Sequence, residues 1–334
     1  MAFLDHLQIK HPIIQAPMAG VTTPEFVAAS AEAGILGSIG AGYLSAEATR
    51  QAIRDARKLT DKPFAVNLFV PEEVEMDQEL FREAYVALQP IGKKLGMPFW
   101  KVALSESGFN EQVDVIIEEG IPVCSFTFGL PSEAVVLKLK QRNIFLIGTA
   151  TSVEEAVLAE KRGMDAVVVQ GKEAGGHRGS FIAEDMIPLE ILVSEAVTKV
   201  TLPIIAAGGI ANKQHMNDML EKGAQAVQLG TALLATEESG AHPLYKEAVL
   251  DAEEGCTVVT KAFSGKSARG IHNQFITMMA NTRVAPYPIQ NDLTKKIRSE
   301  AAVQGRPEFM SLWAGENVHE TVSGSVSQIV EAFK

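Results

Sequence analysis

EKRGMDAVVVQG (160–171) and EKGAQAVQLGT (221–231) repeat one pattern, in which the end of a helix is followed by a glycine and then by a short apolar run. A glycine just past a helix is typical of a C-terminal cap, and a continuous apolar run is typical of a strand buried on both faces. The repeat therefore predicts a helix followed by a strand of a parallel sheet, a unit that can repeat until the sheet closes into a barrel.

Six further apolar runs of the same kind, five before this pair and one between its two members, are separated by amphipathic stretches. The eight expected strands occupy residues 12–18, 36–40, 63–69, 122–128, 143–149, 165–171, 203–209 and 224–231. Eight such units with right-handed crossovers predict a (β/α)8 TIM barrel. An open doubly wound sheet is the alternative, although it rarely reaches eight parallel strands with connections this even.

Helix starts and two irregular regions complete the predicted architecture. Ser152-Val153-Glu154-Glu155 is interpreted as a capping box of the S-x-x-E type. Residues 71–108 are longer than one helix needs, so we predict a helical insertion there. The strand pattern stops after Thr231, and we divide the chain into a barrel over 1–235 and a mostly helical unit over 236–334 that covers the barrel mouth.

The composition limits the classes of partner and compartment. The 334 residues carry a net charge of −11 and show no basic patch with interleaved aromatics, which argues against nucleic acid and anionic membranes as partners. Cys124 and Cys256 are far apart and form no metal-ligand pattern, so we expect neither a disulfide nor a metal site. Without a recognisable leader or a long apolar run, we expect a cytoplasmic protein whose oligomeric state is open.

The carboxyl ends of barrel strands are where active sites form. In this chain those ends are rich in small residues, and the last two, Gly208-Gly209 and Gly230-Thr231, place glycine before a helix or a tight turn. Backbone N–H groups at such positions bind phosphate, whereas glycines that only permit close packing are the alternative. Their presence on adjacent strands favours phosphate binding.

QGKEAGGHRGSF (170–181) is the most distinctive run, because it carries a histidine directly after a strand end. We expect Gly175-Gly176 to bring His177 close to a flat ligand, where it can act as a general base; a histidine on a solvated loop is the alternative. For Glu173 and Arg178 the commoner fate is a salt-bridged place on the surface.

Other polar or soft side chains at strand ends are candidates for ligand contact. The amides of Asn67 and Gln170 can bond the pyrimidine edge of an isoalloxazine, and Met18 can pack on its ring, unless these residues form a polar rim and core filling. Thr127 either contacts substrate or fills its strand end.

Several motifs together carry a family likeness. The chain resembles the nitronate monooxygenases, formerly called 2-nitropropane dioxygenases, of the bacterial and fungal type with an active-site histidine. The resemblance extends over nearly the whole chain and rests on IIQAPMAG (13–20), NLF (67–69), SFTFGLP (125–131), QGKEAGGHRG (170–179), PIIAAGGI (203–210), AVQLGT (226–231), AFSGKSARGIHN (262–273), PYPIQNDLT (286–294) and LWAGE (312–316).

This resemblance implies an enzyme that uses FMN and O2 to convert a nitronate, and possibly a nitroalkane, to a carbonyl compound and nitrite. It implies that His177 is catalytic, either removing the α-proton of a neutral nitroalkane or binding the nitronate in its protonated form. Thr127, Phe128 and Tyr287 are expected to contact substrate. The residues expected to bind FMN are Met18, Asn67, Gln170, Gly175, Gly176, Gly208, Gly209, Gln228, Leu229, Gly230 and Thr231.

Three other interpretations remain open at this stage. A flavin-dependent enoyl-[acyl-carrier-protein] reductase shares the EAGGH motif and requires NAD(P)H, but SFTFGLP and Arg178 after the histidine favour the monooxygenase. An NADH:quinone reductase shares the barrel and departs at the EAGGHRG loop. A flavin-binding barrel without turnover would gain if His177 were exposed and far from any flavin.

Overall fold

The computed structural model describes residues 2–72, 74–105, 107–182 and 185–334, and at its centre lies a sheet of eight parallel strands. Each of the eight expected segments contains one strand, so this prediction is confirmed. The strands are β1 (Ile13–Gln15), β2 (Gly37–Gly40), β3 (Phe64–Phe69), β4 (Val123–Thr127), β5 (Phe145–Ala150), β6 (Ala166–Gln170), β8 (Ile204–Ala207) and β9 (Ala226–Leu229).

The sheet closes into a barrel. Its strand order is β1-β9-β8-β6-β5-β4-β3-β2, and the two outer strands meet through a parallel bridge between Ile14 and Leu36. Across this seam Gln15 N donates to Leu36 O at 2.9 Å, and Leu36 N donates to Ile13 O at 3.1 Å. The (β/α)8 barrel is thus confirmed, and no strand edge is left for another chain to pair with at this seam.

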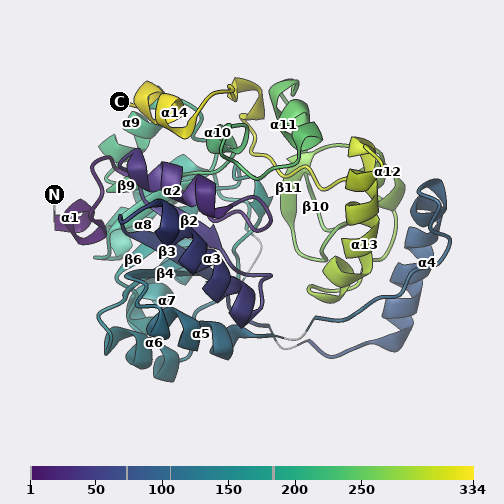
Figure 1. Ribbon diagram of the computed structural model, residues 1–334, viewed down its shortest axis with the longest axis horizontal. Coiled ribbons are helices and arrows are strands. Elements are labelled where there is room, and N and C mark those ends of the chain that lie inside the picture. Colours follow the sequence, from purple (N-terminus) through teal and green to yellow (C-terminus); the bar gives the residue numbers. More distant parts are fainter. Residues whose placement is uncertain (1, 73, 106, 183–184) are drawn as a thin grey trace.

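A helix follows each barrel strand and packs on the outside of the sheet (Figure 1). Gly163 and Gly223, the glycines of the repeated pattern, both adopt a left-handed conformation just past a helix, with φ of 89° and 104°. The helices of the eight units are α2 (Pro24–Glu32), α3 (Ala46–Leu59), α5 (Phe109–Glu118), α6 (Glu133–Lys140), α7 (Val153–Arg162), α8 (Leu189–Lys199), α9 (Lys213–Glu221) and α10 (Thr231–Leu234).

The predicted capping box at the start of α7 is only half formed. Ser152 accepts a hydrogen bond from Glu155 N at 3.2 Å, as an N-cap does. The Glu155 carboxylate does not return to the Ser152 backbone: it is fully buried and accepts from Thr151 N at 2.6 Å and from Phe181 N at 2.6 Å. The prediction of a reciprocal box is therefore wrong, because Glu155 instead binds the segment that follows His177.

Apolar side chains fill the barrel interior. The short helix α1 (Ala2–Leu7) packs its Leu7 against this interior cluster, so one end of the barrel is closed by apolar groups. Every barrel strand or its flank contributes to the cluster, through Ile14, Leu36, Ala65, Val123, Ile147, Val168, Ile205 and Ala226. The opposite end, where the strands finish, is left for a ligand.

The remaining elements gather beside the barrel (Figure 1). The helix α4 (Gln78–Lys94) of the segment 71–108 lies against α13 (Ile289–Val303) and α12 (Gln274–Met279), far from the barrel sheet. Trp100 links the two parts by donating its ring N–H to Leu293 O at 3.0 Å. The other helical elements after the barrel are α11 (Pro243–Leu250), the 3-10 turns η1 (Pro307–Phe309) and η2 (Val318–Glu320), and α14 (Val326–Ala332), which packs on α2.

The C-terminal region also contains two strands that the sequence does not predict. β10 (Thr257–Thr260) and β11 (Ala268–Ile271) form an antiparallel pair. On its other side β11 pairs, also antiparallel, with the two-residue strand β7 (Gly176–His177). This sheet depends on a contact between residues about ninety positions apart, which no local pattern announces. Among the described residues, no helix is both long and apolar enough to cross a membrane.

Candidate active site

A cavity of about 940 Å³ opens at the carboxyl ends of the barrel strands and is closed over by C-terminal residues. Leu229 is the one expected site residue outside its wall: the side chain is 1% exposed and packs in the core. The other expected residues all line the cavity, namely Met18, Asn67, Thr127, Phe128, Gln170, Gly175, Gly176, His177, Gly208, Gly209, Gln228, Gly230, Thr231 and Tyr287.

Strand pairing, rather than a solvated loop, positions His177. The residue lies opposite Ala268 in the β7–β11 pair, and the next residue, Arg178, donates its backbone N–H to Ser267 O at 2.8 Å. The Gln170 amide holds the same segment from the barrel side: its Nε2 donates to His177 O at 3.0 Å, and its Oε1 accepts from Gly179 N at 2.8 Å. Both polar atoms of the Gln170 amide, which is expected to bind the flavin, therefore form hydrogen bonds within the chain.

The surface role expected for Glu173 and Arg178 is wrong. Arg178 is fully buried, and its guanidinium donates to the carbonyl oxygens of Gly171 and Asp185. The Glu173 carboxylate accepts from Leu189 N at 3.0 Å. Both charges are used inside the molecule to shape the loop that carries His177.

Gly175 makes a close contact between two backbones. A Cβ at this position would lie 2.5 Å from both Ala314 C and Gly315 N. The C-terminal segment therefore rests directly on the loop before His177, which only glycine permits. The Gly-Gly pair thus serves chain packing as well as any approach to a flat ligand.

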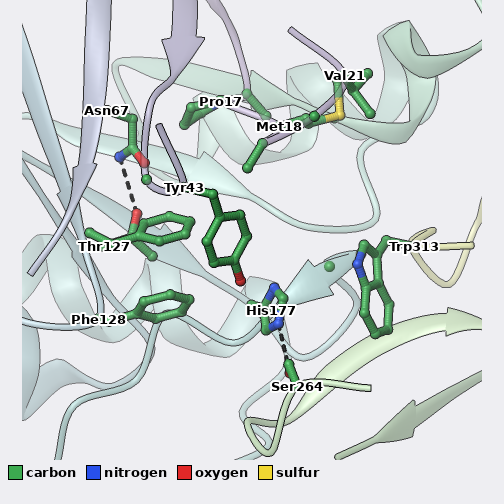
Figure 2. Close-up of a pocket in the computed structure, with 18 of the residues that line it drawn as sticks. Pro17, Met18, Val21, Tyr43, Asn67, Thr127, Phe128, His177, Ser264 and Trp313 are labelled. Carbon is green, nitrogen blue, oxygen red and sulfur yellow. Dashed lines mark hydrogen bonds between the residues drawn. The ribbon is translucent and has the colours of Figure 1, made fainter. Parts of the chain in front are cut away.

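Ser264 holds the His177 ring. Figure 2 shows the two side chains together, with 2.8 Å between His177 Nε2 and Ser264 Oγ. Ser264 Oγ also donates to Lys266 O at 3.1 Å. Because the single hydroxyl proton goes to that carbonyl, the serine oxygen accepts from Nε2–H, and we assign the neutral ring as the Nε2–H tautomer. The basic lone pair is then on Nδ1, which faces away from Ser264.

The surroundings keep the imidazole neutral. Burial, followed by the positive charges of Arg298 and Lys266, lowers the pKa of His177 to about 3. The ring is therefore uncharged at neutral pH, a state that suits a base and does not supply positive charge to a bound anion.

Aromatic rings enclose the histidine. Ring centroids lie 5.8 Å from His177 for Phe128, 6.3 Å for Tyr287 and 5.4 Å for Trp313, and Phe128 and Tyr287 are 5.2 Å apart. Tyr43 extends its hydroxyl toward the same space (Figure 2). Burial raises the pKa of Tyr287, so its hydroxyl remains a protonated donor.

Sequence reasoning did not assign Tyr43, Ser264, Arg298 or Trp313 to the site. Ser264 and Trp313 fall within AFSGKSARGIHN and LWAGE, which were available as family motifs but carried no chemical role. Tyr43 follows a strand end directly and had that signal alone. Nothing local distinguishes Arg298 from the other charges of its helix.

The fold and the site together define a barrel enzyme with a large cavity, a neutral histidine on the cavity wall and glycine-rich strand ends. Among the residues that the structure describes, no cluster of three His, Cys, Asp or Glu side chains is placed to hold a metal ion.

Comparison with known proteins identifies the family. The sequence profile described as nitronate monooxygenase matches residues 2–333. A "Probable nitronate monooxygenase" of Staphylococcus saprophyticus subsp. saprophyticus is 46% identical over 319 residues, which cover 93% of this chain and 90% of that protein. The chain therefore belongs to the nitronate monooxygenase family.

Two solved structures extend this likeness to three dimensions. The nitroalkane oxidase from Streptomyces ansochromogenes matches with a TM-score of 0.93 and 34% identity, covering 100% of this chain and 96% of that one. FabK from Thermotoga maritima matches with a TM-score of 0.78 and 32% identity, covering 99% of this chain and 94% of that one.

Proposed function

We propose that this protein binds FMN and uses O2 to oxidise alkyl nitronates, and nitroalkanes after removal of their α-proton, to a carbonyl compound and nitrite. The observation that carries the proposal is the neutral His177, whose Nε2 is bound to Ser264 inside an aromatic-walled cavity. The names of the relatives, nitronate monooxygenase and nitroalkane oxidase, support this substrate class.

The residues present fit a flavin. Asn67 donates through Nδ2 to Ser125 Oγ at 2.9 Å and to Thr127 Oγ1 at 3.1 Å, while its buried Oδ1 has no hydrogen-bond partner among the described residues. A buried acceptor without a partner is costly, and Asn67 lines the cavity, where a ring N–H of a flavin would satisfy it. Gly208 and Gly209, at φ of 120° and 66°, line the cavity at their strand end, where their backbone N–H groups would be available to a phosphate. They also permit close packing, because a Cβ would lie 3.0 Å from Ala174 N at Gly208 and 2.9 Å from Glu173 Cβ at Gly209.

The chain's own groups divide the remaining chemistry. We assign Met18 and Asn67 to the flavin ring, and Gly208, Gly209 and Gly230 to its phosphate end. When bound, the flavin supplies the electron acceptor for the nitronate. His177 Nδ1 accepts the α-proton of a neutral nitroalkane, and Ser264 keeps the ring in the tautomer that leaves Nδ1 free. The rings of Phe128 and Trp313 give the proton transfer an apolar wall beside His177.

The proposal is tested by anaerobic mixing of the purified yellow protein with ethylnitronate and, separately, with NADH, while the visible absorbance of the flavin is followed. We expect ethylnitronate to change the spectrum rapidly, NADH to leave it unchanged, and admission of O2 to yield nitrite. Bleaching by NADH with no response to ethylnitronate would overturn the proposal and favour a reductase that acts on an enoyl thioester.

A further inference from the structure

Arg298 brings a positive charge to the wall of the cavity without a carboxylate partner. It lies on α13, and its guanidinium is held by polar groups of the same helix: Nε donates to Thr294 Oγ1 at 3.2 Å, and Nη2 donates to Asn291 Oδ1 at 2.7 Å. Nη2 also donates to Asn291 O at 3.1 Å, whereas Nη1 takes part in none of these bonds. In the described part of the chain, no Asp or Glu forms an ion pair with Arg298.

The other charged groups around the cavity are already engaged or face solvent. Lys266 forms an ion pair with Glu72, and Lys295 is exposed. Burial lowers the pKa of Arg298, and the charge of Asp292 opposes this shift only in part. The Asp292 carboxylate itself accepts from Ser105 N at 2.7 Å and from Ser105 Oγ at 2.8 Å. The charge of Arg298 is therefore only partly offset.

The field of Arg298 acts where the substrate must react. Arg298, His177 and Tyr43 line the same cavity, and the positive charge of Arg298 adds to the effect of burial in lowering the pKa of His177. An anion entering this chain, whose net charge is −11, needs a local cation, and the neutral His177 does not provide one. A guanidinium also matches planar groups that present two oxygens, as a nitronate does.

We propose that Arg298 is the specificity residue that binds the negative charge of the substrate, so that the site accepts the nitronate anion in preference to the neutral nitroalkane. The inference rests on the proposed function for the identity of the substrate. The underlying claim, an anion subsite at Arg298, concerns binding and can be measured without turnover.

The experiment uses nitrate, a planar anion that offers no α-proton, as the binding probe for the FMN-loaded protein in calorimetry. Arg298→Gln removes the charge and keeps a donor for Asn291, Arg298→Lys keeps the charge, and Lys295→Gln removes the exposed cation on the same wall as a matched control. We expect Arg298→Gln to weaken nitrate binding and to raise the KM for ethylnitronate, each on the order of 10- to 100-fold, as for the loss of a hydrogen bond to a charged group. Arg298→Lys should retain most of the binding, and Lys295→Gln should change it less than about 3-fold.

The outcomes separate this inference from the proposed function. Equal nitrate affinity and equal KM in Arg298→Gln and wild type, or an equal loss in Lys295→Gln, would overturn the subsite. Loss of nitrate binding only at Arg298, in a protein that does not oxidise ethylnitronate, would uphold the subsite and overturn the function. If Arg298→Gln does not fold, wild type decides: nitrate must inhibit ethylnitronate turnover competitively, and any other pattern, or none, rejects the subsite.

Discussion

Replacing the buried Ser264 by alanine removes one hydrogen-bond partner from the half-buried His177 ring and nothing from the barrel. In the assigned tautomer the hydroxyl accepts from His177 Nε2 at 2.8 Å, and it also accepts from Lys266 N at 3.3 Å and donates to Lys266 O at 3.1 Å. Ser264→Ala therefore leaves a ring N–H and the two backbone groups of Lys266 without this partner. Without the serine, the ring is free to carry its proton on Nδ1. The nitrogen that faces the substrate then has no lone pair and cannot accept the α-proton. We therefore expect turnover of neutral nitroethane to fall while turnover of preformed ethylnitronate is largely kept.

The size of the effect follows from the burial of the pair. A buried donor that loses its partner costs about 1–3 kcal/mol. If that energy is lost from the transition state of proton removal, kcat/KM for nitroethane falls by roughly 10- to 100-fold, at about 1.4 kcal/mol per factor of ten. The same loss in the ground state lowers Tm by about 1–2 °C for each kcal/mol in a chain of this size.

The assay compares nitrite release from freshly dissolved neutral nitroethane and from ethylnitronate by wild type, Ser264→Ala and Ser264→Thr. The threonine variant keeps the hydroxyl and should recover most of the nitroethane activity. Equal losses on both substrates, or a threonine variant as impaired as the alanine variant, would refute the tautomer argument and leave Ser264 with a packing role only.

Three further results follow from the site. His177→Asn should keep the flavin bound and cut turnover of nitroethane by 10²- to 10⁴-fold, as for loss of a general base, while sparing ethylnitronate; full activity on nitroethane, measured as nitrite release, would contradict the assigned role. The pKa of His177 lies at about 3, below its ordinary value of 6.5, so between these pH values the unfolded chain binds a proton that the folded chain does not. The contribution of this group to the free energy of unfolding is therefore complete above pH 6.5 and declines as the pH falls toward 3, by up to about 1.4 kcal/mol per pH unit. Urea titrations at several pH values should find this slope reduced in His177→Asn. Asn67→Leu removes the buried acceptor and should weaken flavin binding on the order of 10-fold in fluorescence titrations of the apoprotein, while an unchanged Kd would remove Asn67 from the flavin site.

Most of the barrel could be predicted because its signals are local. A strand buried on both faces must be continuously apolar, and a helix that ends in a left-handed residue favours glycine, so the eight strands and the caps at Gly163 and Gly223 stand out from the sequence alone. The candidate residues at strand ends converge for the same reason, since parallel strands of a barrel finish at one face. Leu229 is absent from the cavity because side chains alternate along a strand, and this one points into the core.

The sequence by itself determined the barrel, the face on which the cavity lies and the presence of His177 at that face. Tertiary structure alone decided what surrounds that histidine. Ser264 and Trp313 lie against it, and Arg298 lines the same cavity, although all three come from segments some 90 to 140 positions away. The pairing of β11 with β7 and the placing of α13 at the cavity wall bring them there. The use of Glu155 and Arg178 inside the loop was decided in the same way. A side chain's charge state and hydrogen-bond partner depend on every group within a few ångströms, and the chain order does not specify those neighbours until the fold has brought them together.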